Sequence, residues 1–436
     1  MAVSRDAEPP GYLGLGGRLG SGPAPELVEA GFALEMAEAP SLHDGFALAD
    51  IAHALALLDA GVLAPADGAA LLGALLEMAA MPADKFPYEA AFGDPWNSRE
   101  RVLEDLSGPA AGWLWVGRPR REAARVALRL ALRRAVLDAR NAVLALADAY
   151  LHQAQRHRDS LMSDFTYLQP AQPTTLGYVL AGHLQPVVRH LGRLEQAYGW
   201  VNRSPAGAGG TTGTSVPVDR DRLAAHLGFD GVVEHARDAM WQTDGLVELL
   251  AVVASAATEA GQVAADLEIW ASPAYGFVEL ADGYCRVSAL MPQKKNPYAL
   301  AVVRQAAGAV TGALAGVLSG LRTPTARTDH FLLAPGEVRR ALHTFTAGTR
   351  LLAGVVRDLL VDEAALAAGA ADPGLVLGDV ADELVVTGVC DRRTAHQLLG
   401  EAARAATEEG RPVTDADIIG AAGRAGTALP KPVLAA

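Results

Sequence analysis

The sequence predicts an all-α protein, in which a central bundle of long helices carries smaller helical domains at its N- and C-terminal ends. Three observations predict this fold class. Alternating, strand-like patterns are scarce, apolar residues recur every three or four positions over long stretches, and one of these stretches contains neither glycine nor proline. The chain has 436 residues, of which 50% are hydrophobic, so it can bury the large core that such a bundle needs.

Five long helices make up the predicted bundle. The first spans 122–157, which lacks glycine and proline; at about 1.5 Å per residue it would be roughly 50 Å long. Helices this long and this apolar need neighbours on several sides, so we expect other subunits to complete the bundle. The remaining four are expected at about 174–200 with a kink at Pro186, at about 246–270, from Pro297 onward, and after Pro335.

Shorter elements flank the bundle on both sides. Residues 1–108 contain shorter helices, turns and an irregular stretch, and residues from 357 onward contain shorter helices and a break rich in glycine and proline. We therefore expect an N-terminal helical domain at 1–108, a central long-helix domain with the catalytic loop at 109–356, and a C-terminal helical domain at 357–436.

Composition excludes several classes of function. The net charge of −13 argues against nucleic acid or an anionic membrane as a general partner. Two cysteines, Cys285 and Cys390, make neither a disulfide framework nor a cysteine-rich zinc site, which favours a reducing compartment. The most membrane-like stretch, 301–321, carries Arg304 and Gln305 and is interpreted as a bundle helix. With no signal-peptide core at the N-terminus, a soluble cytoplasmic protein is expected.

The segment 287–300 differs from the rest of the chain and reads VSALMPQKKNPYAL. The chain has only four lysines, and two of them, Lys294 and Lys295, stand side by side here. A simple interpretation is available, because Asn296 followed by Pro297 is a good helix start and the lysines would then be solvated charge.

The whole string, however, resembles the signature loop of the fumarase/aspartase superfamily, in the form seen in argininosuccinate lyases. Other segments resemble that family in the same order along nearly the whole chain. They are LGGRL at 15–19, GPAAGWLWVGRPRRE at 108–122, TYLQPAQP at 166–173, SPAGAGGTTGTSVPVDR at 204–220, SPAYGFVELADGY at 272–284, and the C-terminal DVADELVVTGVCDRRTAHQLLGEA.

The resemblance implies a β-elimination in which a base removes a proton from the carbon next to a carboxylate. Negative charge then moves onto that carboxylate, and the neighbouring C–N or C–O bond breaks to leave an alkene, usually fumarate. By resemblance, Ser288 is the base, Lys294 is the positive group that stabilises the charge, and Asn296 is a hydrogen-bond donor beside it. Lys295 has no matched role. A loop that closes over the substrate is expected.

The matched segments also imply which residues bind substrate. Arg120 would clamp a carboxylate with its two-pronged guanidinium. Trp96 and Trp241 stand where the family usually has a histidine and part of a polar Ser-Asp-Arg run. The complete set of substrate-binding residues implied is Arg118, Arg120, Arg121, Thr166, Gln169, Trp96, Trp241 and Met291.

This chain departs from the family pattern at positions expected in the active site. The family's histidine is Tyr167, and the glutamate that pairs with it is Ala301. Tyr167 would either fill the histidine's space as a buried aromatic or donate a proton or hydrogen bond to substrate as a catalytic residue. Arg121 replaces an amide, unless it points to solvent, and the arginine-recognising segment lacks its usual polar residues. We therefore expect a carboxylated substrate other than argininosuccinate.

Three functions remain open from the sequence. The first is a C–N lyase releasing fumarate or a related unsaturated acid; the second is a cycloisomerase or other addition enzyme of the same fold; the third is a non-catalytic homologue. By resemblance the protein would be a homotetramer whose active sites draw Arg120, Tyr167 and Ser288 from different subunits. The sequence shows no metal-ligand cluster and no phosphate loop, so no metal or organic cofactor is expected.

Overall fold

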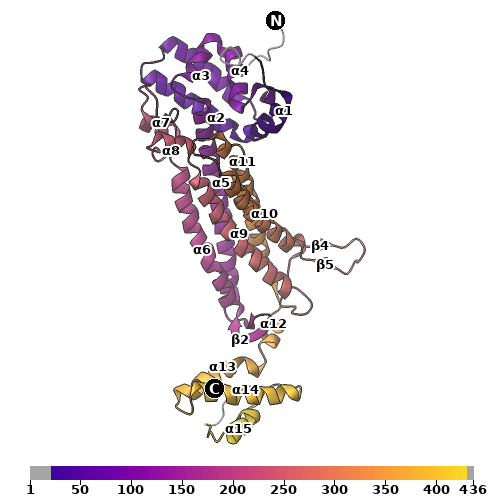
Figure 1. Ribbon diagram of the computed structural model, residues 1–436. Coiled ribbons are helices and arrows are strands. Elements are labelled where there is room, and N and C mark those ends of the chain that lie inside the picture. The colour runs from indigo at the N-terminus through magenta and orange to yellow at the C-terminus, as the bar shows by residue number, and fades with distance from the viewer. Residues whose placement is uncertain (1–20, 430–436) are drawn as a thin grey trace. The chain divides into compact units, whose positions relative to one another are not determined.

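The computed structural model describes residues 21–429, and most of them are helical. The motif at 15–19 lies outside the described residues. The bundle helices are α5 (Arg120–Arg156), α6 (Leu176–Val201), α9 (Asp244–Trp270), α10 (Tyr298–Gly320) and α11 (Ala334–Arg357), all labelled in Figure 1. Each overlaps a helix that the sequence predicts, and α6 continues through Pro186 as one element. The predicted fold class is confirmed.

The chain divides into two compact units. The first contains residues 21–144, 189–260 and 304–350, and the second contains residues 145–188, 261–303 and 351–429. The chain passes repeatedly from one unit to the other, so each of the five long helices has residues in both. The three sequential domains expected from the sequence stay a prediction.

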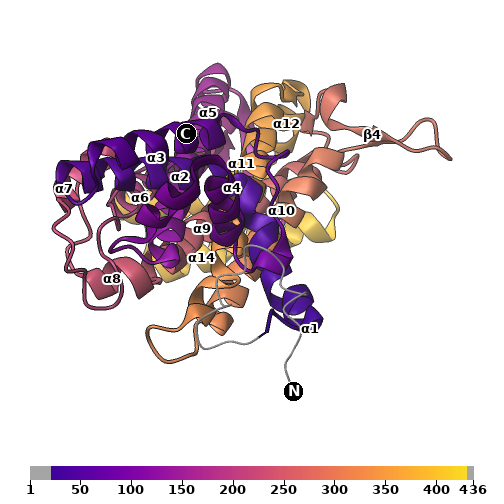
Figure 2. The same cartoon turned by 90° about the horizontal axis from the view of Figure 1, so that it is seen from above.

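The first unit contains the shorter helices near the N-terminus. Helices α2, α3 and α4 pack on one another, as both views show (Figures 1 and 2). Helix α2 also approaches α5 closely at Gly45, where a Cβ atom would lie 2.7 Å from Cα of Ala127. Only glycine allows this contact. The shorter helices are α1 (Pro25–Leu27), α2 (Ala33–Asp59), α3 (Pro65–Ala80), α4 (Pro95–Ser107), α7 (Arg220–His226) and α8 (Ala236–Trp241).

The second unit contains the C-terminal helices and all of the strands. Helices α13, α14 and α15 share one small apolar core. The buried amide of Gln153 on α5 donates to the carbonyls of Val356 and Arg357 at the end of α11, both at 2.9 Å. The helices are α12 (Glu363–Gly369), α13 (Leu377–Val386), α14 (Arg392–Glu408) and α15 (Asp415–Arg424). The strands form three antiparallel pairs: β1 (Leu161–Thr166) with β2 (Gln169–Thr175), β3 (Val278–Glu279) with β6 (Leu360–Val361), and β4 (Arg286–Val287) with β5 (Lys295–Asn296).

Two bundle helices are unusually apolar. Within the described residues, α9 and α10 are long and apolar enough to cross a membrane by length and composition, and the bent pair Glu363–Gly369 and Pro373–Val386 would make a third candidate. Only 44% of the most apolar window of α9 and 22% of that of α10 is buried. A single protomer therefore leaves apolar helix surface exposed.

A buried ion cluster lies in the first unit. Asp50 on α2 accepts from Nε and Nη2 of Arg99 at 3.2 and 3.1 Å, and from Nη2 of Arg118 at 2.6 Å. The indole N–H of Trp96 also donates to it, at 3.4 Å. All four side chains are at most 3% exposed. One carboxylate therefore pairs with two buried guanidinium groups and accepts a hydrogen bond from a buried indole.

Replacing Asp50 with alanine is expected to lower the free energy of unfolding by about 3–5 kcal/mol, because it leaves two buried cations without their anion. Asp44→Ala, at an exposed position on the same helix, is the matched control and should change it by less than about 0.5 kcal/mol. Urea denaturation followed by circular dichroism measures both. Equal losses in the two variants would contradict the role of the cluster.

Candidate active site

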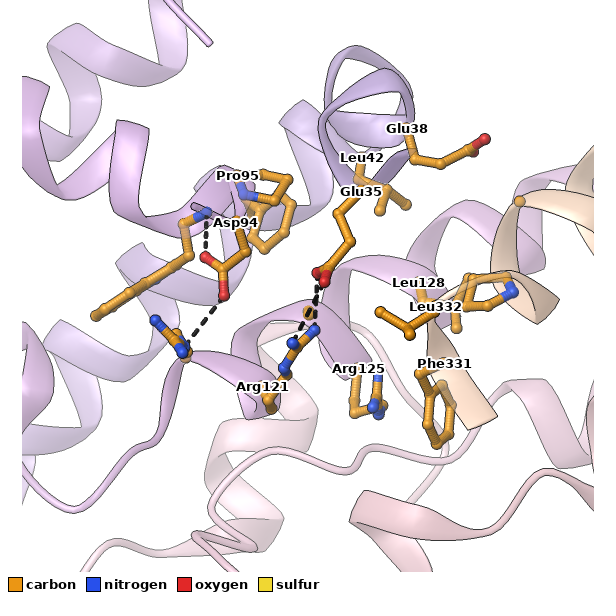
Figure 3. Close-up of a pocket in the computed structure, with 16 residues that line it drawn as sticks. Glu35, Glu38, Leu42, Asp94, Pro95, Arg121, Arg125, Leu128, Phe331 and Leu332 are labelled. Carbon is orange, nitrogen blue, oxygen red and sulfur yellow. Dashed lines mark hydrogen bonds and ion pairs between the residues drawn. The ribbon is translucent and has the colours of Figure 1, made fainter. Parts of the chain in front are cut away.

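A small cavity in the first unit brings together three residues that the sequence implicates in substrate binding. It has a volume of about 60 Å³, and Trp96, Arg120 and Arg121 are among the residues that line it (Figure 3). Arg118 and Trp241 belong to the same unit but do not line this cavity. The three lining residues come from the start of α4 and the start of α5, which are adjacent at this point.

Local sequence explains how Trp96 reaches the cavity. Gly93 has a φ of 98°, which suits glycine, and it reverses the chain just before α4. Asp94 caps the helix, since its carboxylate accepts from the backbone N–H groups of Trp96 and Asn97, and Pro95 occupies the first helical position. Trp96 is then 1% exposed and packs edge-on against another indole. It is both a core residue and part of the cavity wall.

The two arginines at the start of α5 are each held by an acidic partner. Nε of Arg120 lies 3.1 Å from Asp94. Arg121 donates to both oxygens of Glu35 on α2, at 2.8 and 3.4 Å, in the two-pronged geometry that a guanidinium favours with a carboxylate (Figure 3). Arg121 therefore points at Glu35 and not to solvent, and the amide that the family places here has become half of an ion pair.

Arg118 and Glu122 hold the structure around these arginines. Arg118 is 3% exposed and is committed to Asp50 and the carbonyl of Ala49. The buried carboxylate of Glu122 accepts from the backbone N–H groups of Gly207 and Gly209, which fixes the glycine-rich loop after α6. Burial raises the pKa of Glu122. A substrate contact for Arg118 stays a prediction.

Trp241 lies at the end of α8 and packs against a small apolar cluster formed by Ala208, Ala239 and Met240. It is partly exposed, and its indole N–H is enclosed without an acceptor among residues 21–429. Its predicted contact with substrate is untested.

A second carboxyl group in this unit has a strongly shifted pKa. Burial raises the pKa of Glu100 to about 7, against a smaller lowering by the indole N–H of Trp115, which donates to it. No pattern in the sequence points to Glu100. Its carboxyl group lies one helical turn from Trp96 on α4.

Ser288 lies in the second unit, on the loop of the β4–β5 hairpin, which projects away from neighbouring helix ends in both views (Figures 1 and 2). Its Oγ accepts from the backbone N–H groups of Leu290 and Met291, at 3.3 and 3.0 Å. Backbone donors aimed at a serine oxygen stabilise it as an alkoxide, which is the form that can remove a proton. Met291 is 39% exposed on the same loop.

The two adjacent lysines, Lys294 and Lys295, have different surroundings in the structure. Nζ of Lys295 lies 2.7 Å from both Glu279 and Asp282, and these hydrogen bonds raise its pKa. Lys294 is exposed and has no ion pair within the described part of the chain. Its side chain lines an open groove of the second unit together with Asn296, whose amide donates to the carbonyl of Arg286 at 2.9 Å. Lys295 therefore anchors the hairpin, and Lys294 remains available.

Tyr167 lies at the tip of the β1–β2 hairpin. Thr166 pairs with Gln169, so Tyr167 and Leu168 form a two-residue turn, and both have positive φ, at 53° and 59°. A two-residue hairpin turn of this kind needs positive φ at both positions, which costs roughly 1–3 kcal/mol for each non-glycine residue. Tyr167 is 99% exposed, so within its own chain it does not fill a buried space. Thr166 and Gln169 are exposed beside it.

Several cavity residues escaped the sequence analysis. Arg125 and Phe331 line the cavity with Glu35 and Asp94. Arg125 follows Arg121 by one helical turn, so the helical period was a usable signal. Glu35 and Phe331 carried no signal, because they lie far from α5 in sequence. Among the side chains that the structure describes, which exclude those of residues 328 and 329, no group of three or more His, Cys, Asp or Glu could hold a metal ion.

Comparisons with known proteins identify the family. The family model described as Lyase matches residues 23–312. The argininosuccinate lyase of Halobacterium salinarum is 36% identical over 384 residues, covering 87% of this chain and 77% of the relative. Argininosuccinate lyase 1 of Mesorhizobium japonicum is 32% identical over 398 residues, covering 90% and 84%. The chain belongs to the argininosuccinate lyase-like part of the fumarase/aspartase superfamily.

A solved structure supports this assignment. EDDS lyase in complex with formate has a TM-score of 0.83 and 28% identity, covering 95% of this chain and 83% of that one. An EDDS lyase variant with bound fumarate aligns equally well. As an argininosuccinate lyase-like member of the superfamily, the chain is a carbon–nitrogen lyase that acts by β-elimination. The family predicted from the sequence is confirmed.

Proposed function

We propose that this lyase releases fumarate, or a related unsaturated acid, from an N-succinyl amine other than argininosuccinate. By an N-succinyl amine we mean an amine whose nitrogen is bonded to carbon 2 of succinate. The observation that carries the proposal is the pair of hydrogen bonds that two backbone N–H groups donate to Oγ of Ser288. They supply what an otherwise weak base needs, on the loop that also holds Lys294 and Asn296.

The proposed reaction follows from these groups. The Ser288 alkoxide takes a proton from the carbon next to a carboxylate, and the electron pair moves onto that carboxylate. Lys294 and the second N–H of the Asn296 amide stabilise the resulting double negative charge. The electrons then return, the C–N bond breaks, and the nitrogen takes a proton from the Tyr167 hydroxyl or from water as the amine leaves. Tyr167 is proposed to donate a proton or a hydrogen bond, since its phenol is fully available.

The rewritten recognition residues support a substrate other than argininosuccinate. The histidine–glutamate pair of the family is absent, since Tyr167 and Ala301 occupy those positions. Arg121 replaces an amide and is paired with Glu35. The indole of Trp96 forms part of the cavity wall where the family has a histidine. Each change alters substrate contacts while Ser288, Lys294 and Asn296 are kept.

We also propose a cytoplasmic homotetramer with shared active sites. The exposed apolar surface of α10 supports burial against other copies of the chain, because only 22% of its most apolar window is buried in one protomer. The strained and exposed turn at Tyr167 supports the same arrangement, since a partner subunit could pack against this side chain. Analytical ultracentrifugation measures the oligomeric state, and a monomer would contradict this assembly.

Turnover of a panel of N-succinyl amines, argininosuccinate included, tests the reaction. Mass spectrometry should detect fumarate and free amine from at least one member other than argininosuccinate, at a rate that exceeds that for argininosuccinate. Preferred turnover of argininosuccinate would overturn the proposed substrate class. Silence across the panel from a folded protein would favour a non-succinyl substrate or a cyclisation.

A further inference from the structure

Arg125 is a buried cation that has no ion pair with any carboxylate whose side chain the structure describes. It lies on α5 in the first unit and is 6% exposed. Its Nε donates to the carbonyl of Met240 at 3.1 Å, and its guanidinium carbon lies 3.2 Å from the ring centroid of Phe331. Its Nη2 is enclosed and has no acceptor in the described part of the chain. An unmatched guanidinium in such a position is costly, so it calls for an explanation.

The carboxylates near Arg125 are already paired with other arginines. Glu35 is bound by Arg121 at 2.8 Å, and Asp94 by Arg120 at 3.1 Å. The third carboxylate of the lining, Glu38, accepts from Arg339 at 2.7 Å and Arg340 at 2.6 Å. The lining holds three arginines and three carboxylates, but Glu38 is shared by two further arginines from outside the lining, so Arg125 is the lining arginine with no ion pair to a described carboxylate. Burial, followed by repulsion from Arg121, holds the pKa of Arg125 well below its usual range.

The cavity beside Arg125 has the size and lining of a subsite for a small acid. Its volume is about 60 Å³, and one water molecule needs about 10–15 Å³ on this measure. It can thus hold a carboxylate on a short stem. The walls next to Arg125 are apolar, with Phe331, Leu128 and Leu332 close by (Figure 3). Charge-assisted hydrogen bonds are strengthened in such a water-poor site.

We propose that Arg125 is a specificity-determining residue that binds a carboxylate on the amine portion of the substrate. This rests on the proposed function, because it assigns the leaving amine to the acidic amines. The planar carboxylate matches the fork of the guanidinium, whose face is held by Phe331 and whose Nη2 is the atom left without an acceptor in the described part of the chain. The pairing would supply the anion that the described side chains do not provide.

Two matched substrates test the proposal. N-(2-carboxyethyl)aspartate ends in a carboxylate, and N-(3-methylbutyl)aspartate ends in an isopropyl group of similar size and shape. The wild-type enzyme should prefer the acid in kcat/KM by about 10- to 100-fold, the usual weight of a hydrogen bond to a charged group. Arg125→Met should abolish this preference, mainly by raising KM for the acid, and Arg125→Lys should keep part of it. Arg134→Met, at an exposed position on the same helix, should keep all of it.

A binding measurement separates this proposal from the proposed function. Saturation-transfer NMR with propionate should show binding to the wild type and to Arg134→Met, and a loss of at least about tenfold in affinity in Arg125→Met. Binding that depends on Arg125 without turnover of any N-succinyl amine would leave the subsite standing and sink the proposed reaction. Turnover without a preference for the acid, or a preference that survives Arg125→Met, would overturn the subsite. Circular dichroism checks folding, and Arg125→Gln replaces the methionine variant if that one does not fold.

Discussion

Ser288→Ala is expected to lower kcat for the best N-succinyl amine by about 10²- to 10⁴-fold, the range typical of losing a positioned proton-transfer group. The hydroxyl lies on an exposed hairpin loop, and its partners are two backbone N–H groups of the same loop. Those donors can bond to water in the variant, so the melting temperature and oligomeric state should not change. Fumarate formation, followed by the absorbance of its double bond, gives the rate.

A matched serine makes the result specific. Ser41→Ala removes an exposed hydroxyl on α2 that only donates to a carbonyl within its own helix turn. It should leave kcat unchanged. A Ser288→Ala enzyme that retains more than about a tenth of wild-type activity would remove Ser288 from the role of base, since even the weakest general-base contributions exceed that.

Lys294→Met and Lys295→Met are expected to have different effects although the two residues are adjacent. Lys294→Met should lower kcat by about 10²- to 10³-fold, because it deletes the positive charge proposed to stabilise the intermediate. Lys295→Met should lower kcat by less than about tenfold, since an exposed ion pair contributes little to stability. Steady-state kinetics on the same substrate measures both variants.

Hydrogen exchange in the hairpin provides a second measurement for the lysines. Loss of the bonds from Lys295 to Glu279 and Asp282 should speed amide exchange across β4 and β5, whereas Lys294→Met should not. Equal losses of kcat in the two variants would contradict the division of roles. So would faster exchange in the Lys294 variant alone.

The fold was predictable because its signals are local. The period of apolar residues along 122–157 and 246–270 depends only on neighbours in sequence, and the structure has helices at Arg120–Arg156 and Asp244–Trp270. Helix starts are also predicted from neighbouring residues, since proline and a capping side chain act over only a few positions. The stretch 301–321 was expected to be a buried bundle helix; the structure has a helix at Tyr298–Gly320, of whose most apolar window 22% is buried in one protomer.

The candidate catalytic loop was predictable for a related reason. Ser288, Lys294 and Asn296 lie within nine positions of one another, so a contiguous string carries the resemblance. The string could not show which lysine is available. That depends on Glu279 and Asp282, and their two hydrogen bonds to Lys295 exist only once the hairpin has formed.

The sequence by itself determined the helical bundle, the superfamily and the loop, because helical periodicity and a contiguous motif are properties of neighbouring residues. Only the tertiary structure decided which charges remain unmatched. Arg121 pairs with Glu35, 86 positions away in sequence, and Arg118 pairs with Asp50, 68 positions away. The ring of Phe331, which lies between α10 and α11, covers the guanidinium of Arg125. The Coulomb attraction between two charges falls with the distance between them and is stronger where they are buried. The partner of a cation is therefore set by packing and not by its place in the chain.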